Sequence, residues 1–350
     1  MNFEMDGDVL ALADAIAEFF ARRSDAEAIT AASMTSRTAD RQRWAALCEM
    51  GLPALRVPEP AGIGARLLEA TVVAEKVGAV LVPEPAAATI VLASAWSAHE
   101  QSTGFLDALC GGSRITALCG FDTVELSETG VVSGRACVPD DDETDAVALP
   151  ARDCGAGESA IVVLDTAALP PPVRRSAADP TRPTATVDLE GARPVDILRI
   201  GDWTAHRREL ALLTAAELVG GMQALLTKTI DHAKGRQQFG RPIGSFQTIK
   251  HRLADMYIAT EQARAAVQLA AVACEDGADT ASATVASAAR WVPRAAIEVA
   301  ETAIHLHGAM GYSWETGVHL HLRRALTTRH DFDRSKLLAI GALSPLVEAV

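Results

Sequence analysis

The stretch GRQQFGRPIGSFQTIKH, residues 235–251, joins two long segments in which apolar residues recur with helical periodicity. A simple connecting turn has little need for Arg236, Phe239, Gln247 and three glycines. An arginine guanidinium is planar and permanently charged, so it can bind phosphate oxygens in pairs. Glycines allow the backbone to approach a ligand closely, and a glutamine amide can hydrogen-bond to the edge of an adenine ring. This stretch therefore predicts an interhelical turn that binds a phosphate-bearing ligand.

The segments that follow this stretch predict long helices that pack into a bundle. Their apolar residues recur every three or four positions, which is the spacing of one face of a helix. The first stripe is Ile249, Leu253, Met256, Thr260, Ala263, Val267, Ala270 and Cys274, and the second is Val285, Ala289, Val292, Ala296, Val299, Ala303 and Leu306. Pro293 lies inside the second stripe and is expected to kink that helix. We expect a four-helix bundle over residues 206–350.

The first 205 residues divide into a helical part and a β-rich part. Helical periodicity covers residues 8–20, 66–82 and 86–98, which predicts an N-terminal helical domain over residues 1–110. Eight of the 16 prolines lie between Pro139 and Pro194, and they exclude long helices there. Short β-type runs occupy residues 114–118, 130–137, 145–149, 160–164 and 184–189. The chain is therefore predicted to be an α+β protein with a small middle β domain over residues 111–205.

Composition and charge exclude several classes of function. The chain has 350 residues, 49% of them apolar, and a formal charge of −13, which argues against non-specific binding to nucleic acids or anionic membranes. Six widely spaced cysteines show no metal-ligand spacing and are expected to be reduced and buried. The acidic start lacks the basic residues of a signal peptide, and no uninterrupted apolar run of about 20 residues is present. We expect a cytoplasmic protein without a bound metal.

Two motifs at a characteristic separation resemble those of the acyl-CoA dehydrogenase family. Residues 236–247 match the pattern R-x-x-F-G-x-x-I-x-x-x-Q of that family, and HLHGAMGYSWE, residues 305–315, matches Q-x-H-G-G-x-G-Y-x-W-E. The segment 179–182, Asp-Pro-Thr-Arg, is similar to one found in bacterial members. The predicted order of helical domain, β domain and bundle is also that of the family. The resemblance covers nearly the whole chain and is greatest to actinobacterial members.

The resemblance implies FAD as cofactor, shared between neighbouring subunits. It places Arg236 at the FAD pyrophosphate of the neighbour, and a glycine-rich turn at residues 308–311 offers backbone amides to the same phosphates. The implied cofactor-binding residues are Arg236, Gln238, Phe239, Ile243, Gln247, His305, Gly308, Ala309 and Gly311. Two of them depart from the family pattern, since His305 replaces a glutamine and Ala309 replaces a glycine. Arg236 as a surface salt bridge, and His305 with His307 as packed helix-end histidines, remain alternatives.

The catalytic base of the family is not found at its usual position. The family removes an α-proton from an acyl-CoA thioester with a desolvated carboxylate while the flavin accepts a β-hydride. Phe332 stands where most members carry the glutamate, and a neighbouring Asp331 is displaced by about 100° around a helix. Some members carry the base at the start of the first bundle helix, where Glu209 is a candidate; its alternative is an acid favoured by the helix dipole. Glu217 falls on an apolar face and is expected to be structural.

The segment 118–126 also lacks the T-E-x-x-x-G-S-D type of loop that binds the flavin ring in the family. Loss of the base and of this loop, beside a retained phosphate-binding stretch, indicates division of labour between unlike subunits. The leading hypothesis is a subunit of an α2β2 acyl-CoA dehydrogenase that acts on bulky acyl-CoA substrates, steroid-derived ones included. The alternatives are a self-sufficient homotetramer that uses Glu209 or Asp331 as base, and a flavin-free structural homologue. The resemblance implies an electron-transferring flavoprotein as electron acceptor.

Overall fold

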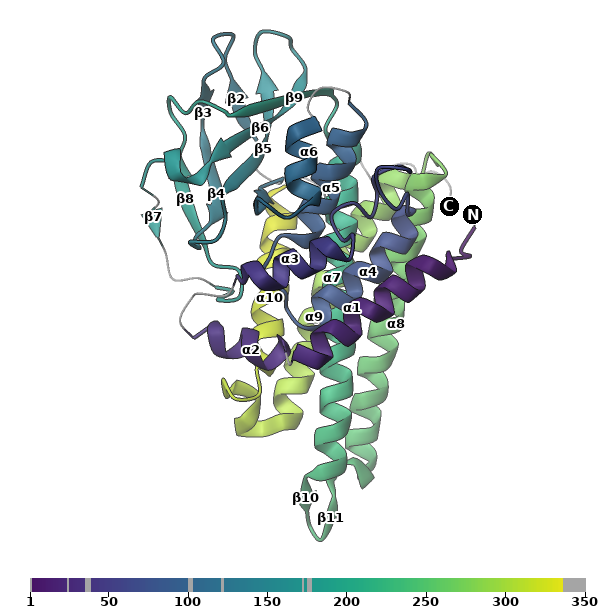
Figure 1. The fold of residues 1–350 in the computed structure, drawn as a ribbon. Helices are drawn as coiled ribbons and strands as arrows, with labels where there is room; N and C mark the ends of the chain where they lie inside the picture. Colours follow the sequence, from purple (N-terminus) through teal and green to yellow (C-terminus); the bar gives the residue numbers. More distant parts are fainter. Residues whose placement is uncertain are drawn as a thin grey trace.

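A helical part, a β-rich part and a helical bundle follow one another along the chain (Figure 1). The computed structural model describes residues 2–23, 25–34, 39–99, 103–120, 123–171, 173–174 and 178–335. The helical part contains α1 (Gly7–Arg23), α2 (Asp25–Ala32), α3 (Arg41–Glu49), α4 (Leu67–Ala79), α5 (Ala86–Ser97) and α6 (Thr103–Cys110). Sequence periodicity predicted α1, α4 and α5, whereas α2, α3 and α6 are too short for it. Helix α3 begins instead at a local signal, because the Asp40 carboxylate accepts hydrogen bonds from the amides of Gln42 and Arg43.

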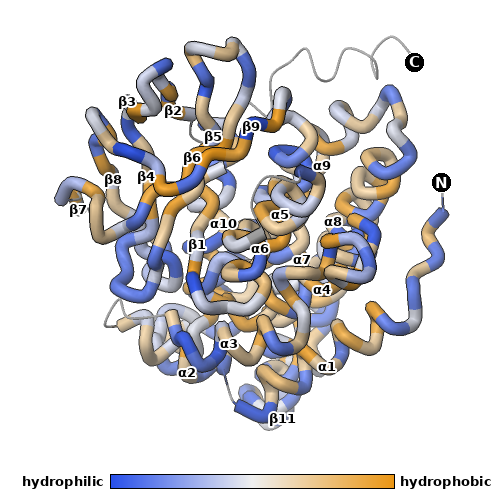
Figure 2. Tube along the Cα trace, turned by 45° about the horizontal axis from the view of Figure 1, so that its top comes forward, coloured by the Kyte–Doolittle hydropathy of each residue, from blue (hydrophilic) through white to orange (hydrophobic). Residues whose placement is uncertain are grey.

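The β-rich part forms two sheets with an apolar core between them. The larger sheet has the order β3-β2-β5-β6-β9, with β1 also paired to β5, and the smaller has the order β4-β8-β7. The strands are β1 (Thr116–Leu118), β2 (Val124–Leu126), β3 (Val132–Ser133), β4 (Arg135–Pro139), β5 (Ala146–Asp153), β6 (Ser159–Asp165), β7 (Val173–Arg174), β8 (Thr184–Asp188) and β9 (Asp196–Gly201), with a 3-10 turn η1 (Thr166–Ala168) after β6. Strand β6 is hydrophobic over most of its length (Figure 2). All five predicted β runs contain a strand, but β2, β7 and β9 were not predicted.

The last part is the predicted four-helix bundle. It comprises α7 (Thr204–Gly235), α8 (Gln247–Glu275), α9 (Ala281–His307) and α10 (Val318–Arg334), with β10 (Gln237–Gln238), β11 (Arg241–Pro242), η2 (Ile243–Ser245) and η3 (Gly308–Tyr312) in the connections. Helix α9 continues through Pro293 as one element. Residues 336–350, at the end of the predicted bundle domain, lie outside the described residues.

Two glycines allow the N-terminal part to pack directly on the bundle. A Cβ atom at Gly78 of α4 would lie 2.0 Å from the carbonyl oxygen of Glu217 in α7. A Cβ atom at Gly220 of α7 would lie 1.8 Å from the carbonyl oxygen of Glu75 in α4. Only glycine at both positions permits this backbone approach. This close contact fixes α4 against α7. A cavity remains elsewhere, where the three parts of the chain meet.

Of two expectations from composition, that of uniformly buried cysteines is wrong, whereas that of no long uninterrupted apolar run stands. Among the described residues, helix α7 is long and apolar enough to cross a membrane by length and composition alone, but Glu217 interrupts its apolar run. Its apolar window is 78% buried within the protein, as in the core helix of a bundle. The cysteines also differ in burial, because Cys48 is buried whereas Cys154 is exposed.

Candidate functional site

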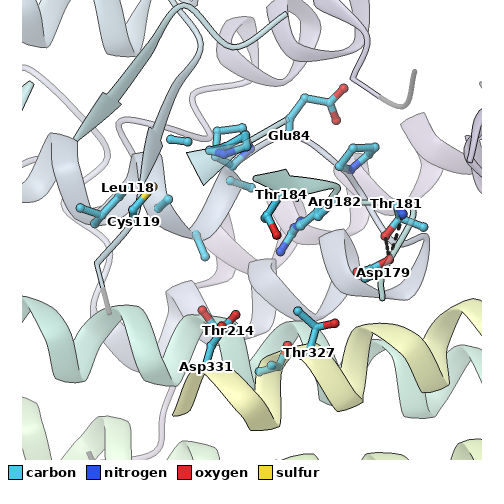
Figure 3. A pocket seen from close by; sticks show the side chains of 18 of the residues that line it. Glu84, Leu118, Cys119, Asp179, Thr181, Arg182, Thr184, Thr214, Thr327 and Asp331 are labelled. Carbon is cyan, nitrogen blue, oxygen red and sulfur yellow. Dashed lines mark hydrogen bonds between the residues drawn. The ribbon is translucent and has the colours of Figure 1, made fainter. Parts of the chain in front are cut away.

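A cavity of about 220 Å³ lies where the three parts of the chain meet (Figure 3). Its walls come from the start of α5, the end of β1, strand β4, the segment 179–184, and one side each of α7 and α10. Ala87, Ala117 and Leu118 form apolar wall, whereas α10 contributes Thr327 and Asp331. The cavity therefore combines apolar surface with a few convergent polar groups, which is the composition of a small-molecule site.

Four charged residues from three segments form one side of this cavity. Arg182 Nη1 donates to Glu217 Oε2 at 2.7 Å, and Arg182 Nη2 donates to the Val82 carbonyl at 2.8 Å. The guanidinium of Arg324 forms an ion pair with the Asp179 carboxylate, and its Nη1 lies 3.9 Å from Glu217 Oε2. The two positive and two negative charges balance, so the cluster is neutral as a whole. Such pairing is required because isolated buried charges are strongly unfavourable.

Burial and neighbouring charges shift the pKa values of Asp179 and Arg324 in this cluster. Burial works against ionisation of Asp179, but Arg324 and the hydroxyl and amide of Thr181 overcome it, and the pKa of Asp179 falls below its ordinary value. Burial, followed by the positive charge of Arg182, lowers the pKa of Arg324. A catalytic base needs a pKa raised toward the working pH. Asp179 therefore serves as a partner for Arg324 and not as a base.

The structure separates Asp331 from Phe332. Helix α10 continues to Arg334, so consecutive side chains diverge by about 100° around its axis. Phe332 is fully buried and is not part of the cavity wall, whereas Asp331 lines the cavity. Asp331 also lies near Arg334, with 3.8 Å between Oδ1 and Nη2. Phe332, which the resemblance places at the usual base position, is thus a core residue, while the carboxylate of Asp331 before it faces the cavity.

Glu209 and Glu217 occupy different environments on α7. Glu209 is buried, forms an ion pair with Arg56 and lies 3.8 Å from His206 Nδ1, and it does not line the cavity. Glu217 lines the cavity but is already engaged by Arg182. The structure therefore brings Asp331 and Glu217 to the cavity and leaves Glu209 outside it.

The segment that carries the flavin-ring loop in the family is occupied by local packing here. Strand β1 ends at Leu118, and the Trp203 indole donates to the Gly120 carbonyl at 3.3 Å. A Cβ atom at Gly120 would lie 2.4 Å from a methyl carbon of Leu210. The chain resumes in β2 at Val124, and Phe121 and Asp122 of the predicted ring segment lie outside the described residues.

The stretch over residues 235–251, with which the sequence analysis began, forms a hairpin that projects from the end of the bundle (Figure 1). Strands β10 and β11 pair through Gln238 and Arg241, and Phe239 and Gly240 between them adopt positive φ angles of 52° and 77°. Phe239 is 91% exposed and meets Phe246 edge to face, with 6.1 Å between ring centroids. The Arg241 guanidinium lies 4.2 Å from the centre of the Phe246 ring. The hairpin is thus held in shape by ring contacts while Phe239 stays exposed.

The remaining residues of this stretch flank the hairpin. Arg236 caps the end of α7, where its amide donates to the His232 carbonyl at 2.8 Å, and its carbonyl accepts from the Ile243 amide at 2.8 Å. Gln247 starts α8, and its amide nitrogen lies 3.5 Å from His251 Nε2. Arg236, Gln238 and Gln247 are all exposed. Their side chains are available at the tip of the bundle.

The two family motifs meet at this end of the bundle. The rings of His232, in the last turn of α7, and His307, in the last turn of α9, stack with 4.3 Å between centroids. The turn η3 follows directly, with Gly308 at a φ of 62°. A Cβ atom at Gly311 would lie 2.5 Å from the Ile304 carbonyl oxygen, so this position accepts only glycine. The alternative of packed helix-end histidines fits His307, which is 7% exposed, but not His305, which is exposed.

The turn borders a shallow pocket of its own. His305, Gly308 and Ala309 line it together with Tyr312 and Leu322. The pocket lies at the start of α10, whereas Asp331 lies in the last turn of that helix. Nine positions separate Leu322, at the pocket, from Asp331, which corresponds to about 14 Å along the helix axis. The two groups of predicted site residues therefore occupy two separate places in one subunit.

Sequence analysis did not identify the polar cluster of the cavity as a unit. Asp179 and Arg182 were noted only as part of the segment 179–182, which resembles one in bacterial members, and Arg324 was not singled out. Arg324 and Asp179 are 145 positions apart in the chain. A pattern of nearby residues cannot reveal such a pair, because only the fold brings the two segments together.

The order of helical part, two-sheet β part and four-helix bundle around a central cavity is that of the acyl-CoA dehydrogenase fold. Two family profiles match the chain: Acyl-CoA dehydrogenase, N-terminal domain, over residues 7–113, and Acyl-CoA dehydrogenase, C-terminal domain, over residues 208–330. The chain is 34% identical over 318 residues to acyl-CoA dehydrogenase IpdE2 of Mycobacterium tuberculosis, which covers 90% of this chain and 89% of that protein. The chain belongs to the acyl-CoA dehydrogenase family.

Solved structures of similar proteins agree with this fold over nearly the full length. The ChsE4-ChsE5 complex from Mycobacterium tuberculosis superposes with a TM-score of 0.83 at 25% identity and covers 99% of this chain and 98% of the matched chain. A variant of the Tcur3481-Tcur3483 steroid acyl-CoA dehydrogenase has a TM-score of 0.83 at 23% identity, covering 98% of this chain and 99% of that one. The α+β architecture predicted from the sequence is confirmed.

Proposed function

We propose that this chain is a subunit of an α2β2 acyl-CoA dehydrogenase, in which it completes the FAD site of a base-bearing partner subunit. The observation that carries the proposal is the contrast between two places in the chain. The hairpin and the glycine turn keep the cofactor-binding motifs and expose them at the tip of the bundle. The position of the usual base is filled by the buried ring of Phe332.

The residues at the tip of the bundle fit the phosphate and adenosine end of FAD. No ion pair or hydrogen bond involves the Arg236 side chain among the described residues, so its guanidinium is available for pyrophosphate oxygens. Gly308, at a φ of 62° and with no neighbour within 4 Å of a Cβ atom, leaves the backbone of the turn open to those oxygens, while Gly311 lets the turn pack on Ile304. Phe239 presents an exposed ring on which an adenine can stack, and the exposed Gln247 amide can hydrogen-bond to the edge of such a ring.

Bound FAD supplies the acceptor for the β-hydride when the acyl-CoA is oxidised to its α,β-unsaturated form. In the proposed complex this chain binds and orients the cofactor, because its charges hold the cofactor phosphates at a fixed position relative to the partner's active site. The partner contributes the carboxylate that removes the α-proton. The expected substrate is a bulky, steroid-derived acyl-CoA, and the expected electron acceptor is an electron-transferring flavoprotein. Support for a steroid substrate comes from the relatives, one of which is named a steroid acyl-CoA dehydrogenase.

The flavin content of this chain, purified alone and with candidate partners, tests the proposal. We expect a colourless chain that acquires FAD absorbance and dehydrogenase activity only when it is co-produced with a family member carrying the glutamate base. A yellow, active homo-oligomer would contradict the proposal. A chain that stays colourless with every partner would indicate the flavin-free structural homologue instead.

A self-sufficient homotetramer is the second candidate, and the placement of Asp331 in the cavity wall favours it. In that case Asp331 would be the base and the cavity would hold the acyl group. The buried ion pair of Glu209 with Arg56 makes Glu209 the weaker choice of base. Asp331→Asn would abolish activity in a homotetramer, whereas in the proposed heteromer it would leave activity at the partner's site largely unchanged.

A further inference from the structure

Helix α9 presents one polar face to solvent. Its opposite face buries Val292, Ala296, Val299 and Ala303 in the core of the bundle. Six exposed side chains lie on the solvent face, within about 100° of the helix circumference and over about 21 Å of its length. These side chains are Ser287, Arg290, Trp291, Arg294, Glu298 and Glu301. The solvent face of α9 is therefore one narrow stripe that carries charge along its length.

The four charges of this stripe are divided by sign between its two halves. Arg290 and Arg294 lie one turn apart in the first half, and Glu298 and Glu301 lie one turn apart in the second. None of the four side chains forms an ion pair or a hydrogen bond within the part of the chain that the structure describes. Like charges one helical turn apart repel each other, so this grouping is unfavourable in an isolated helix. Opposite charges from outside the subunit relieve that repulsion.

The spacing of the charges matches an antiparallel copy of the same helix. A two-fold axis at position 296 places Arg294 opposite Glu298 of the copy, because positions 294 and 298 are equally distant from 296. The same axis places Trp291 opposite Glu301 of the copy, with Arg290 one position away. Symmetry forms each of these contacts twice. A parallel copy would instead place arginine against arginine and glutamate against glutamate.

Trp291 adds apolar area beside these charges. Its side chain is 39% exposed and borders an open groove of about 580 Å³ between α9 and α8, where Gln262 and Ala266 form the other wall. Tryptophan and arginine are the residue types that most often dominate the binding energy of protein interfaces. Glu298 and Glu301 disfavour a nucleic acid or an anionic membrane as the occupant, since both are negatively charged. The stripe therefore suits a protein helix with the same pattern of charge.

We propose that α9 forms a contact between two copies of this chain, which pack antiparallel about a two-fold axis near position 296 with reciprocal Arg294–Glu298 ion pairs. This contact goes beyond the proposed function and does not depend on it. An α2β2 complex and a homotetramer both contain two copies of this chain. The contact also involves neither a flavin nor the central cavity, so it can be measured without either.

Sedimentation velocity of the purified full-length chain, without flavin or partner, tests the proposal. We expect self-association that weakens as the salt concentration rises, because exposed charges are screened. Arg294→Glu should weaken it at least about ten-fold, because both symmetry-related pairs then join two carboxylates. Glu298→Arg should do the same, because both pairs then join two guanidinium groups. An unchanged chain that is monomeric at every concentration would overturn the proposal. So would a monomeric chain whose Arg294→Glu variant loses the base-bearing subunit, since the stripe would then bind the unlike chain.

Mixing the two variants locates the contact. In an equimolar mixture of the Arg294→Glu and Glu298→Arg proteins, each pair joins a carboxylate to a guanidinium, so the mixture should associate about as tightly as the unchanged chain. The double variant restores the same pairs and should also recover. Arg193→Glu is the matched control, because it reverses an exposed charge in the connection from β8 to β9 and should leave association unchanged. Circular dichroism establishes that each variant is folded. Unchanged association of Arg294→Glu, or no association in the mixture, would overturn the proposal.

Discussion

At the scale of single residues, the buried charge cluster of the cavity couples three parts of the chain. Asp179 lies before β8, Glu217 lies in α7, and Arg324 lies in α10. Arg324 also reaches the Leu81 carbonyl at 3.4 Å, in the connection that follows α4. A buried ion pair of this kind contributes little net stability, but loss of one partner leaves an uncompensated charge. The cluster therefore makes the relative position of these segments depend on a few side chains.

Replacement of Arg324 should be strongly destabilising. Arg324→Met is expected to lower the free energy of unfolding by about 3–5 kcal/mol, because Asp179 would remain buried without its cation. The double variant Asp179→Asn with Arg324→Met should recover a large part of this loss. Urea unfolding of the single and double variants measures the coupling. Arg22→Met, in an exposed pair with Glu18, is the control and should change stability by less than about 1 kcal/mol.

His321 should make stability depend on pH. The pKa of His321 is lowered to about 3, first because its surroundings desolvate the ring and second because Lys228 adds a positive charge. The imidazole is therefore neutral in the folded protein, while in the unfolded chain it binds a proton below about pH 6.5. Its contribution is fully present above pH 6.5 and is lost as the pH falls from about 6.5 toward 3, by up to about 1.4 kcal/mol per pH unit.

His321→Gln should flatten this dependence. Unfolding free energies measured by urea titration between pH 7 and pH 5 should fall less steeply in the variant than in the unchanged protein. His232, His307 and His319 also have lowered pKa values, and their effect is common to both proteins. The same replacement at exposed His330 on the same helix is the control. Equal slopes for His321→Gln and the unchanged protein would contradict the assignment.

At the scale of elements, the β10–β11 hairpin and the turn η3 form one surface at the tip of the bundle. The stack of His232 on His307 joins the ends of α7 and α9, from which these two elements emerge. The hairpin is hydrophilic at its tip (Figure 2), apart from the exposed ring of Phe239. An element that protrudes with an exposed aromatic ring and an available cation is suited to contacts outside its own subunit.

Arg236→Ala tests the role of the hairpin. In the proposed complex the variant should bind FAD about ten- to one-hundred-fold more weakly, because a charge-assisted pair with the pyrophosphate is lost. Flavin retained after gel filtration of the complex is the measurement. Lys234→Ala removes an equal charge two positions earlier, at an exposed site paired with Asp231, and should retain flavin. Equal retention in both variants would argue against the assignment of Arg236.

Gly311→Ala tests the role of the turn. The new methyl group would collide with the Ile304 carbonyl, so we expect the free energy of unfolding to fall by about 1–3 kcal/mol and flavin retention to decrease. Thermal unfolding and flavin absorbance report the two effects. Gly104→Ala in α6 is the control, because the added methyl has no neighbour within 4 Å. A Gly311→Ala protein as stable as the Gly104→Ala protein would contradict the tight packing of this turn.

At the scale of the whole molecule, one subunit carries two separate places that a flavin enzyme uses together. The proposed cofactor surface lies at the tip of the bundle, and the cavity lies at the other end of α10. If this subunit supplies only the phosphate side, the number of flavins should equal the number of base-bearing partner chains. Native mass spectrometry of the complex should then give one FAD for every two protein chains. One FAD per chain would show that this subunit also binds a flavin in its own cavity.

The sequence alone determined the elements and the motifs. Apolar periodicity predicted α1, α4, α5 and the bundle helices, because the side chains that repeat along one helix face are the ones that it buries. The hairpin and the turn η3 were recognisable because their residues are consecutive, and their backbone geometry depends on local glycines. Short elements such as α2 and β7 escaped prediction, since they contain too few residues to establish a period.

Only the tertiary structure decided which residues surround each candidate catalytic residue. Asp331 faces the cavity and Phe332 faces the core because α10 continues as a helix past both residues, which a linear comparison of motifs does not reveal. Glu209 became an ion-pair partner of Arg56 because residues more than 150 positions apart are packed together. The residues of the cavity and of its charge cluster are likewise brought together only by the fold. These residues come from segments that share no local pattern. A buried charge is tolerated only beside an opposite charge, and the fold alone brings the two together.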